Sequence, residues 1–172
     1  MLRIAITGPP GSGKSTVCRN VLKQLTCTYG GMTSADIRVK GERLGFEIRD
    51  IATEKQGTLA HKQGSGPPVG SYHVNLEDLN NIGVAAIRNA MSSDLVVVDE
   101  IAPMELKSPE FIRAVDVVLD SDKNMLAVVH QRSSHRIAER IRREFELHTV
   151  TLENRENLVS EIANKINKAF SK

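Results

Sequence analysis

Tryptophan is absent from the chain, and aromatic residues make up only 3% of its 172 positions. Aliphatic side chains must therefore supply most of the core. The two cysteines, Cys18 and Cys27, are too few for a disulfide framework, so we expect reduced thiols and a cytoplasmic location. The apolar run at residues 2–7 is also too short for the core of a signal peptide.

Neither positive nor negative residues predominate, because the formal net charge is only +2. So small an excess gives little reason to expect nucleic acid as a partner. No run of about eighteen apolar residues occurs, so we expect no membrane-spanning helix and no membrane partner. A chain of this length with 40% hydrophobic residues can bury its own core, which predicts one domain over residues 1–172. We favour a monomer.

Short apolar runs alternate with segments in which apolar residues recur at helical spacing. This alternation predicts an α/β fold of three layers, in which helices cover both faces of a mostly parallel sheet. The predicted strands are 2–7, 95–98, 124–130 and 147–152, and the predicted helices are 14–26, 75–90, 109–119, 133–145 and a last helix through Ile166.

Residues 35–51 break this pattern, because apolar and polar residues alternate there with a period of two. Residues 40–43 make a plausible tight turn in the middle of the segment, so we expect a β-hairpin. Further short strands are predicted at 58–61 and 72–74, with a glycine-rich loop between them. We interpret the region as an antiparallel extension of the sheet.

The strongest motif lies between the first predicted strand and the first predicted helix. It matches the pattern G-x-x-x-x-G-K-[ST] of a phosphate-binding loop. Backbone N–H groups in such a loop converge on phosphate oxygens, and the positive end of the following helix points at the same oxygens. Nucleoside triphosphates are thus the expected ligands. The motif residues are Gly8, Pro9, Pro10, Gly11, Ser12, Gly13, Lys14 and Ser15, and we add Thr16, which follows them.

Two side chains of this motif have distinct expected roles. Lys14 would place a positive charge near the β- and γ-phosphates, and the Ser15 hydroxyl would be a ligand of Mg²⁺. A second Mg²⁺ ligand is expected in Asp99, which follows the apolar run at 95–98 where parallel strands present their carboxyl ends. Glu100 either points the other way along the strand or lies at its frayed end, where it would orient a water molecule on the γ-phosphate.

The segment after Asp99 carries a family resemblance. Residues 99–106, Asp-Glu-Ile-Ala-Pro-Met-Glu-Leu, resemble the signature of the thermophilic, or cancer-related, nucleoside-triphosphatase family. The segments 41–46, 69–74 and 153–156 match the same family in the same order. The resemblance implies a phosphate-loop NTPase fold that hydrolyses ATP, GTP, CTP or UTP to the diphosphate with Mg²⁺. Family members more often have glycine where this chain has Ala102, which would strain the turn if a positive φ were needed there.

Three further residues are weaker candidates. Arg132 follows the strand at 124–130 and would reach the γ-phosphate as an internal arginine finger, although arginine-rich segments are usually solvated helix faces. Asn154 and Arg155 follow the last predicted strand and would flank the base, because arginine can stack on it and asparagine can hydrogen-bond to it. A helix-capping role for Asn154 is an equal alternative.

Two other functions remain open from the sequence. The first is a nucleotide or small-molecule kinase, since the arginines after residue 131 and the loop at 64–70 would suit a phosphorylated acceptor and its cover. The second is a GTP-binding adaptor protein, an interpretation that rests on fold alone. No Asn-Lys-x-Asp segment for guanine recognition occurs in the chain.

Overall fold

Nine strands form one mixed sheet in the computed structural model, which describes residues 1–171. The strands follow each other across the sheet in the order β5-β6-β4-β3-β2-β7-β8-β1-β9. Their bounds are β1 Arg3–Thr7, β2 Tyr29–Val39, β3 Glu42–Asp50, β4 Gln56–His61, β5 Pro68–Val69, β6 Tyr72–Val74, β7 Leu95–Ile101, β8 Asn124–Val129 and β9 Glu146–Thr149.

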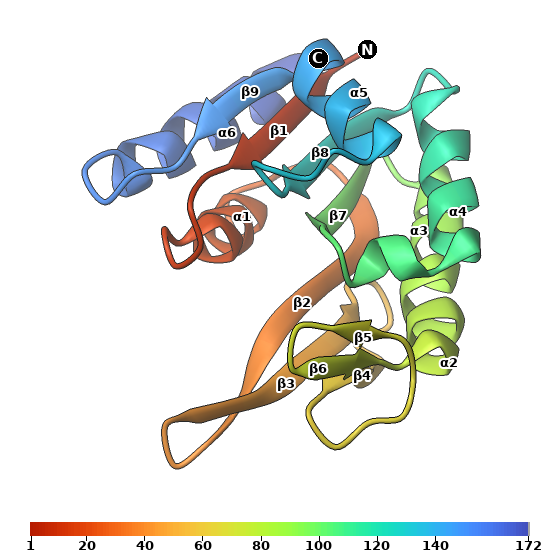
Figure 1. The fold of residues 1–172 in the computed structure, drawn as a ribbon. Helices are drawn as coiled ribbons and strands as arrows, with labels where there is room; N and C mark the ends of the chain where they lie inside the picture. Colours follow the sequence, from red (N-terminus) through yellow and green to blue (C-terminus); the bar gives the residue numbers. More distant parts are fainter. Residues whose placement is uncertain (172) are drawn as a thin grey trace.

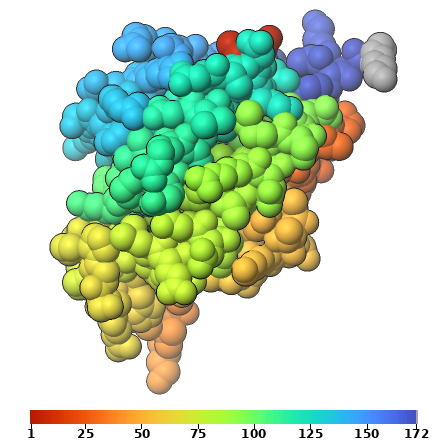
Figure 2. Space-filling model, turned by 90° about the vertical axis from the view of Figure 1, so that its right-hand side faces the viewer, coloured from red at the N-terminus to blue at the C-terminus, as the bar shows by residue number. Residues whose placement is uncertain are grey.

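Helices cover both faces of the parallel part of this sheet (Figure 1). Helices α1 and α6 pack against each other on one face, and the remaining helices lie on the other, where they make the surface seen in Figure 2. The helix bounds are α1 Lys14–Leu22, α2 Leu76–Asp78, α3 Ala85–Asn89, α4 Pro109–Leu119, α5 Arg136–Glu144 and α6 Arg155–Phe170, with a π-helical segment η1 Leu79–Val84 and 3₁₀ turns η2 Ala90–Ser92 and η3 Glu105–Lys107. In residues 1–171, no helix combines the length and apolar character needed to cross a bilayer.

The sheet changes direction at β2. Strands β2, β7, β8, β1 and β9 are parallel to one another, whereas β3, β4, β6 and β5 continue the sheet from β2 in antiparallel pairs. The first residues of β2 pair with β7 and its later residues pair with β3. The predicted mostly parallel three-layer sheet and its antiparallel extension are both confirmed.

Side chains of the central strands alternate between two separate cores, as the pleat of a strand requires. Val97 of β7 packs with α1 and α6, whereas its neighbours Val96 and Val98 pack with the helices of the opposite face. The same alternation divides Leu126 from Met125 on β8. Strands covered on both faces are apolar at every position, which explains the unbroken runs in the sequence.

Several predicted boundaries were wrong, for local reasons. The first helix ends at Leu22 and not at residue 26, because the Thr26 amide donates to Oδ1 of Asn167 and the chain turns toward α6. Strand β2 begins at Tyr29, six residues before the predicted start. The prediction missed this beginning because Gly30 and Gly31 have low β-propensity. The helix predicted over 75–90 contains the wider turn η1.

Candidate active site

The carboxyl ends of three neighbouring parallel strands form the site. Strand β1 leads into the phosphate-binding loop, β7 carries Asp99 and Glu100, and β8 lies between them and leads into residues 130–135. In parallel sheets this edge is where ligands bind. Figure 1 shows β1, β7 and β8 side by side with α1 starting at this edge.

The phosphate-binding loop closes with a backbone hydrogen bond from the Ser12 amide to the Pro9 carbonyl at 3.1 Å. Gly13 precedes α1 in the left-handed conformation, with φ at 96°. A Cβ atom at this position would lie only 3.0 Å from Cδ of Arg155. The backbone conformation favours glycine at Gly13, and a larger residue there would also make the exposed Arg155 side chain shift.

Lys14 joins the loop to the end of β7. Its ammonium lies 3.2 Å from Oε2 of Glu100 and also donates to the Gly8 carbonyl at 3.2 Å. Both side chains of the ion pair are mostly buried, with 12% of Lys14 and 21% of Glu100 exposed. The cation expected to bind phosphate and the carboxylate expected to orient water thus lie in direct contact.

Asp99 is fully buried beside the first turn of α1. Its Oδ1 accepts a hydrogen bond from the Ser15 hydroxyl at 3.0 Å, and its Oδ2 has no hydrogen-bond partner among residues 1–171. Burial, and then the nearby Glu100 carboxylate, raise the pKa of Asp99 to about 7. A hydroxyl and a buried carboxyl oxygen without a partner are hard oxygen donors, which Mg²⁺ prefers. The residues therefore fit a Mg²⁺ ion that takes few ligands from the protein.

Glu100 neither lies at a frayed strand end nor follows a regular strand, because β7 continues to Ile101. The pairing with β8 shifts at this point: Asp99 pairs with Val128 and Ile101 pairs with Val129, which leaves Glu100 without a partner on β8. A regular strand would send neighbouring side chains to opposite faces. Here both carboxyl groups contact the start of α1.

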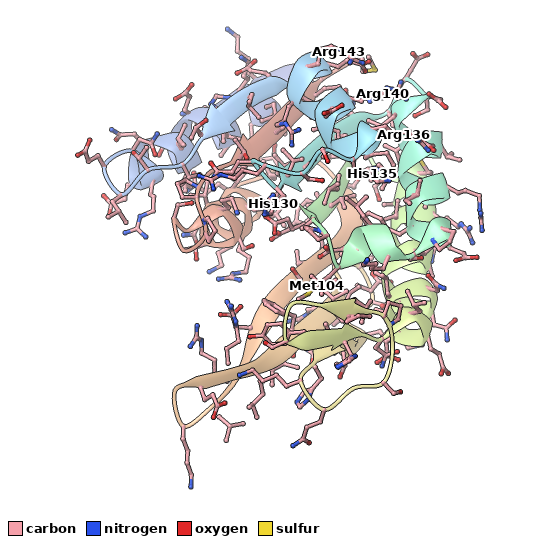
Figure 3. All side chains as sticks on the ribbon, viewed as in Figure 1. Met104, His130, His135, Arg136, Arg140 and Arg143 are labelled. Atoms are coloured by element: carbon pink, nitrogen blue, oxygen red, sulfur yellow. The ribbon has the colours of Figure 1, made fainter. Side chains whose placement is uncertain are left out.

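Arg132 lies in the loop after β8, with its side chain exposed. No hydrogen bond or ion pair within residues 1–171 engages its guanidinium, whereas the other arginines of this segment have partners. Figure 3 shows His130 at the end of β8 and three of these other arginines along α5. The partners are Asp116 for Arg136, Asp120 and Glu144 for Arg140, the His130 and Ser133 carbonyls for Arg142, and Glu144 for Arg143.

These pairings bear on the kinase interpretation. The arginines after residue 131 suggested a site for a phosphorylated acceptor, yet Arg136 and Arg140 stabilise the contact of α5 with α4 through carboxylates. The argument for an acceptor site from a cluster of cations is weaker as a result.

Asn154 and Arg155, both expected to flank the base, differ in what their side chains contact. The Asn154 side chain accepts from the Thr151 amide and donates to the Thr149 carbonyl, so it shapes the loop before α6. Asn154 does occupy the N-cap position of α6, and its carbonyl accepts from the Leu158 amide, but its side chain makes no capping hydrogen bond, so the expected side-chain cap is absent. Arg155 packs on Gly13 and lines a cavity of about 610 Å³ together with Thr16.

Glu105 is a residue of the site that the sequence did not identify. It begins η3, its side chain is buried, and its Oε2 has no hydrogen-bond partner in the described part of the chain. Burial and the nearby Glu100 carboxylate raise the pKa of Glu105 well above its ordinary value. The possible strain at Ala102 does not arise, since the positive φ values of non-glycine residues among 1–171 fall at Lys40 and Glu54.

Comparison with known proteins identifies the family. A family model described as NTPase matches residues 3–163. The nucleoside-triphosphatase THEP1 of Methanosarcina acetivorans is 53% identical over 169 residues, which cover 96% of this chain and 97% of that protein. THEP1 of Methanocaldococcus jannaschii is 40% identical over 96% of this chain and 97% of its own length.

Two solved structures share the fold. The crystal structure of THEP1 from the hyperthermophile Aquifex aeolicus superposes with a TM-score of 0.87 at 27% identity, covering 96% of this chain and 99% of that chain. The solution structure of a human cancer-related nucleoside triphosphatase superposes with a TM-score of 0.79 at 28% identity, covering 99% and 100%. The chain therefore belongs to the nucleoside-triphosphatase family that its phosphate-binding loop and the segment after Asp99 resemble.

Proposed function

We propose that this nucleoside-triphosphatase uses Mg²⁺ to hydrolyse ATP, GTP, CTP or UTP to the diphosphate and phosphate, with water as the acceptor. The observation that carries the proposal is the placement of Asp99 against Ser15 and of Glu100 against Lys14. These two contacts put a candidate metal ligand and a candidate water-orienting carboxylate at the mouth of one phosphate-binding loop.

The reaction is an in-line displacement at the γ-phosphorus. The oxygen of water forms the new bond to phosphorus as the bond to the β–γ bridging oxygen breaks. Glu100 would accept a hydrogen bond from the water, which orients one lone pair toward phosphorus. Lys14 and the loop amides would stabilise the charge that spreads over the phosphate oxygens, and Arg132 would reach the γ-phosphate from the loop after β8.

Ser15 and Asp99 would hold Mg²⁺, which when bound neutralises phosphate charge and orients the phosphate oxygens. The protonated form of Asp99 cannot serve as this ligand, so its ionisation is coupled to metal binding. The Ser15–Asp99 hydrogen bond keeps the two oxygens at one place before the metal arrives.

Base tolerance is supported by the cavity next to α1. Its lining from α1 and α6 includes Thr16, Asn20, Arg155 and Asn157, and no aromatic side chain contributes to it. Arg155 would stack on a base through its guanidinium plane, and stacking on a cation does not distinguish one base from another. Since the Asn154 side chain is already bonded to its own loop, Arg155 is the better candidate for base contact.

A phosphate-release assay tests the proposal. The four triphosphates are compared with and without Mg²⁺, in wild type, in Glu100→Gln and in the control Glu139→Gln, whose side chain is exposed on α5. We expect release from all four nucleotides only with Mg²⁺, a loss on the order of 100-fold in kcat for Glu100→Gln, and no change for the control. Full turnover by Glu100→Gln with nucleotide bound would remove Glu100 from the mechanism.

The same assay separates hydrolysis from transfer. Nucleoside monophosphates and small phosphate or hydroxyl acceptors are added, and the products are followed by mass. Transfer to any acceptor faster than hydrolysis would favour a kinase. We further propose that residues 1–172 work as one domain and as a monomer, which light scattering with and without nucleotide measures.

A further inference from the structure

Residues 130–135 connect β8 to α5 and carry Arg132, whose exposed side chain has no hydrogen bond or ion pair within residues 1–171. The start of this connection is tied to β7, because the His130 amide donates to the Ile101 carbonyl at 3.0 Å. Within the loop, the Arg132 amide donates to Nδ1 of His130 at 3.1 Å. The backbone of Arg132 is thus fixed relative to the strand that carries Asp99 and Glu100.

A second set of bonds comes from α5. One guanidinium nitrogen of Arg142, Nη1, donates to the His130 carbonyl at 2.7 Å, and Nη2 donates to the Ser133 carbonyl at 2.5 Å. The two accepting carbonyls lie on either side of Gln131 and Arg132. One rigid, planar side chain therefore spans the segment whose middle carries the exposed arginine.

Arg142 differs in this respect from its neighbours on α5. Arg136, Arg140 and Arg143 pair with carboxylates on α4, just after it or on α5, and Arg140 also donates to the Leu119 carbonyl at the end of α4; none of these bonds reaches residues 130–135. Arg142 is half-buried and directs both of its hydrogen bonds to loop carbonyls. Charge-assisted bonds of this kind are stronger than bonds between neutral groups.

We infer that Arg142 is a positioning residue for the reaction: its two-carbonyl clamp presets the loop from which Arg132 acts on the γ-phosphate. The inference rests on the role of Arg132 proposed above. A long arginine side chain on a mobile loop must lose backbone freedom as well as rotamer freedom when it engages a phosphate. The clamp removes the backbone part of this cost in advance, so its contribution appears in the transition state and not in nucleotide binding.

A double-mutant cycle in Arg132 and Arg142 tests the inference. The variants are Arg132→Ala, Arg142→Ala, the double variant, and Arg142→Lys, whose single ammonium cannot bridge both carbonyls in the plane of a guanidinium. Arg143→Ala is the matched control, because Arg143 neighbours Arg142 on α5 and its side chain is exposed in a pair with Glu144. For each variant, kcat and KM for ATP and the midpoint of unfolding in urea are measured.

We expect Arg132→Ala to lower kcat by at least about tenfold with little change in KM, as for an arginine finger. Arg142→Ala should lower kcat by about three- to tenfold, and Arg142→Lys should not restore it. In the Arg132→Ala background, Arg142→Ala should change kcat by less than about twofold while still lowering the urea midpoint. Arg143→Ala should match wild type.

The outcomes separate the two ideas. If Arg132→Ala retains wild-type kcat, the proposed role of Arg132 is wrong, and the inference that Arg142 positions Arg132 for the reaction is wrong with it. If Arg132→Ala lowers kcat but the effects of the two substitutions multiply in the double variant, Arg132 keeps its role and the inference about Arg142 is wrong. Multiplying effects would mean that Arg142 stabilises the fold and influences the reaction by another route.

Discussion

The ammonium of Lys14 and the carboxylate of Glu100 form a mostly buried ion pair that joins the phosphate-binding loop to the end of β7. Each group also has a proposed task toward the nucleotide. An incoming γ-phosphate would therefore share the ammonium with Glu100, which places the carboxylate next to the phosphorus that it serves.

The first prediction concerns Lys14. Replacing it by alanine removes the only side-chain cation within 4.0 Å of Glu100 among residues 1–171. We expect Lys14→Ala to weaken binding of a non-hydrolysable triphosphate by about 100-fold or more, since a buried charge is left unpaired and the phosphates lose their cation. Calorimetry measures the affinity, and Lys23→Ala, at the exposed end of α1, is the control. Unchanged heats for Lys14→Ala would overturn the proposed nucleotide site.

The second prediction is a pH dependence that originates at Asp99. Its pKa in the folded chain is about 7, above the ordinary value near 3.8, so the unfolded state ionises first as the pH rises. The unfolded state therefore binds fewer protons between these values, and folding stability falls from about pH 4 to about pH 7. The loss amounts to at most roughly 4 kcal/mol.

Urea unfolding in EDTA at several pH values measures this effect. Asp99→Asn should be more stable than wild type near pH 8 and should lose this part of the pH dependence. Adding Mg²⁺ with a nucleotide should raise the free energy of unfolding of the wild-type protein but not that of Asp99→Asn, because only the ionised carboxylate binds the metal. A variant less stable than wild type at pH 8 would contradict the prediction.

Glu105 provides a third prediction. Because burial raises the pKa of Glu105 well above its ordinary value, ionising it in the folded state is unfavourable, and stability again decreases as the pH rises above the ordinary range. Glu105→Gln keeps the shape and removes the charge. We expect it to raise the free energy of unfolding at pH 8 by about 1–3 kcal/mol and to have little effect at pH 4. Glu139→Gln, at an exposed position of α5, should show neither effect.

The fourth prediction separates two demands on Gly13. Alanine there would meet both an unfavourable positive φ and the Arg155 side chain at 3.0 Å. Gly41→Ala is a matched control, since Gly41 has φ at 80° in the β2–β3 turn with no atom within 4 Å of the added Cβ. Both variants should lose about 1–2 kcal/mol of stability through backbone strain. Only Gly13→Ala should also weaken nucleotide binding, measured by calorimetry at 25 °C.

The phosphate-binding loop, the Asp99–Glu100 pair and the alternating strands and helices were all predictable, because each depends on local spacing. A strand covered on both faces must be apolar throughout, and a phosphate loop must place glycine and lysine at fixed positions. Each of these constraints produces a pattern of residue types that can be recognised within a short segment of the sequence. The helix predicted over 109–119 is of the same kind, and Ser108 caps it by accepting from the Phe111 amide.

Long-range features left no such pattern. The position of β8 between β1 and β7 depends on how the strands associate, and it brings the loop after β8 to the same edge of the sheet as the phosphate-binding loop and Asp99. The clamp from Arg142 spans 12 residues to His130, and nothing in the sequence distinguishes this arginine from Arg143 beside it. Glu105 was assigned no chemical role from the sequence, because its burial comes from the path of the chain after β7.

Strand β2 has a consequence for how the molecule can be altered. It is anchored beside β7 through Tyr29–Met32, runs in the same direction as β7, and continues with β3 as an arm beyond the edge where the nucleotide would bind (Figure 1). The arm ends at Lys40 and Gly41, next to Val39, which is 51% exposed. A dye or a fused domain attached at this tip would stay outside both cores, yet it would share one continuous strand with the catalytic edge and could report on events there.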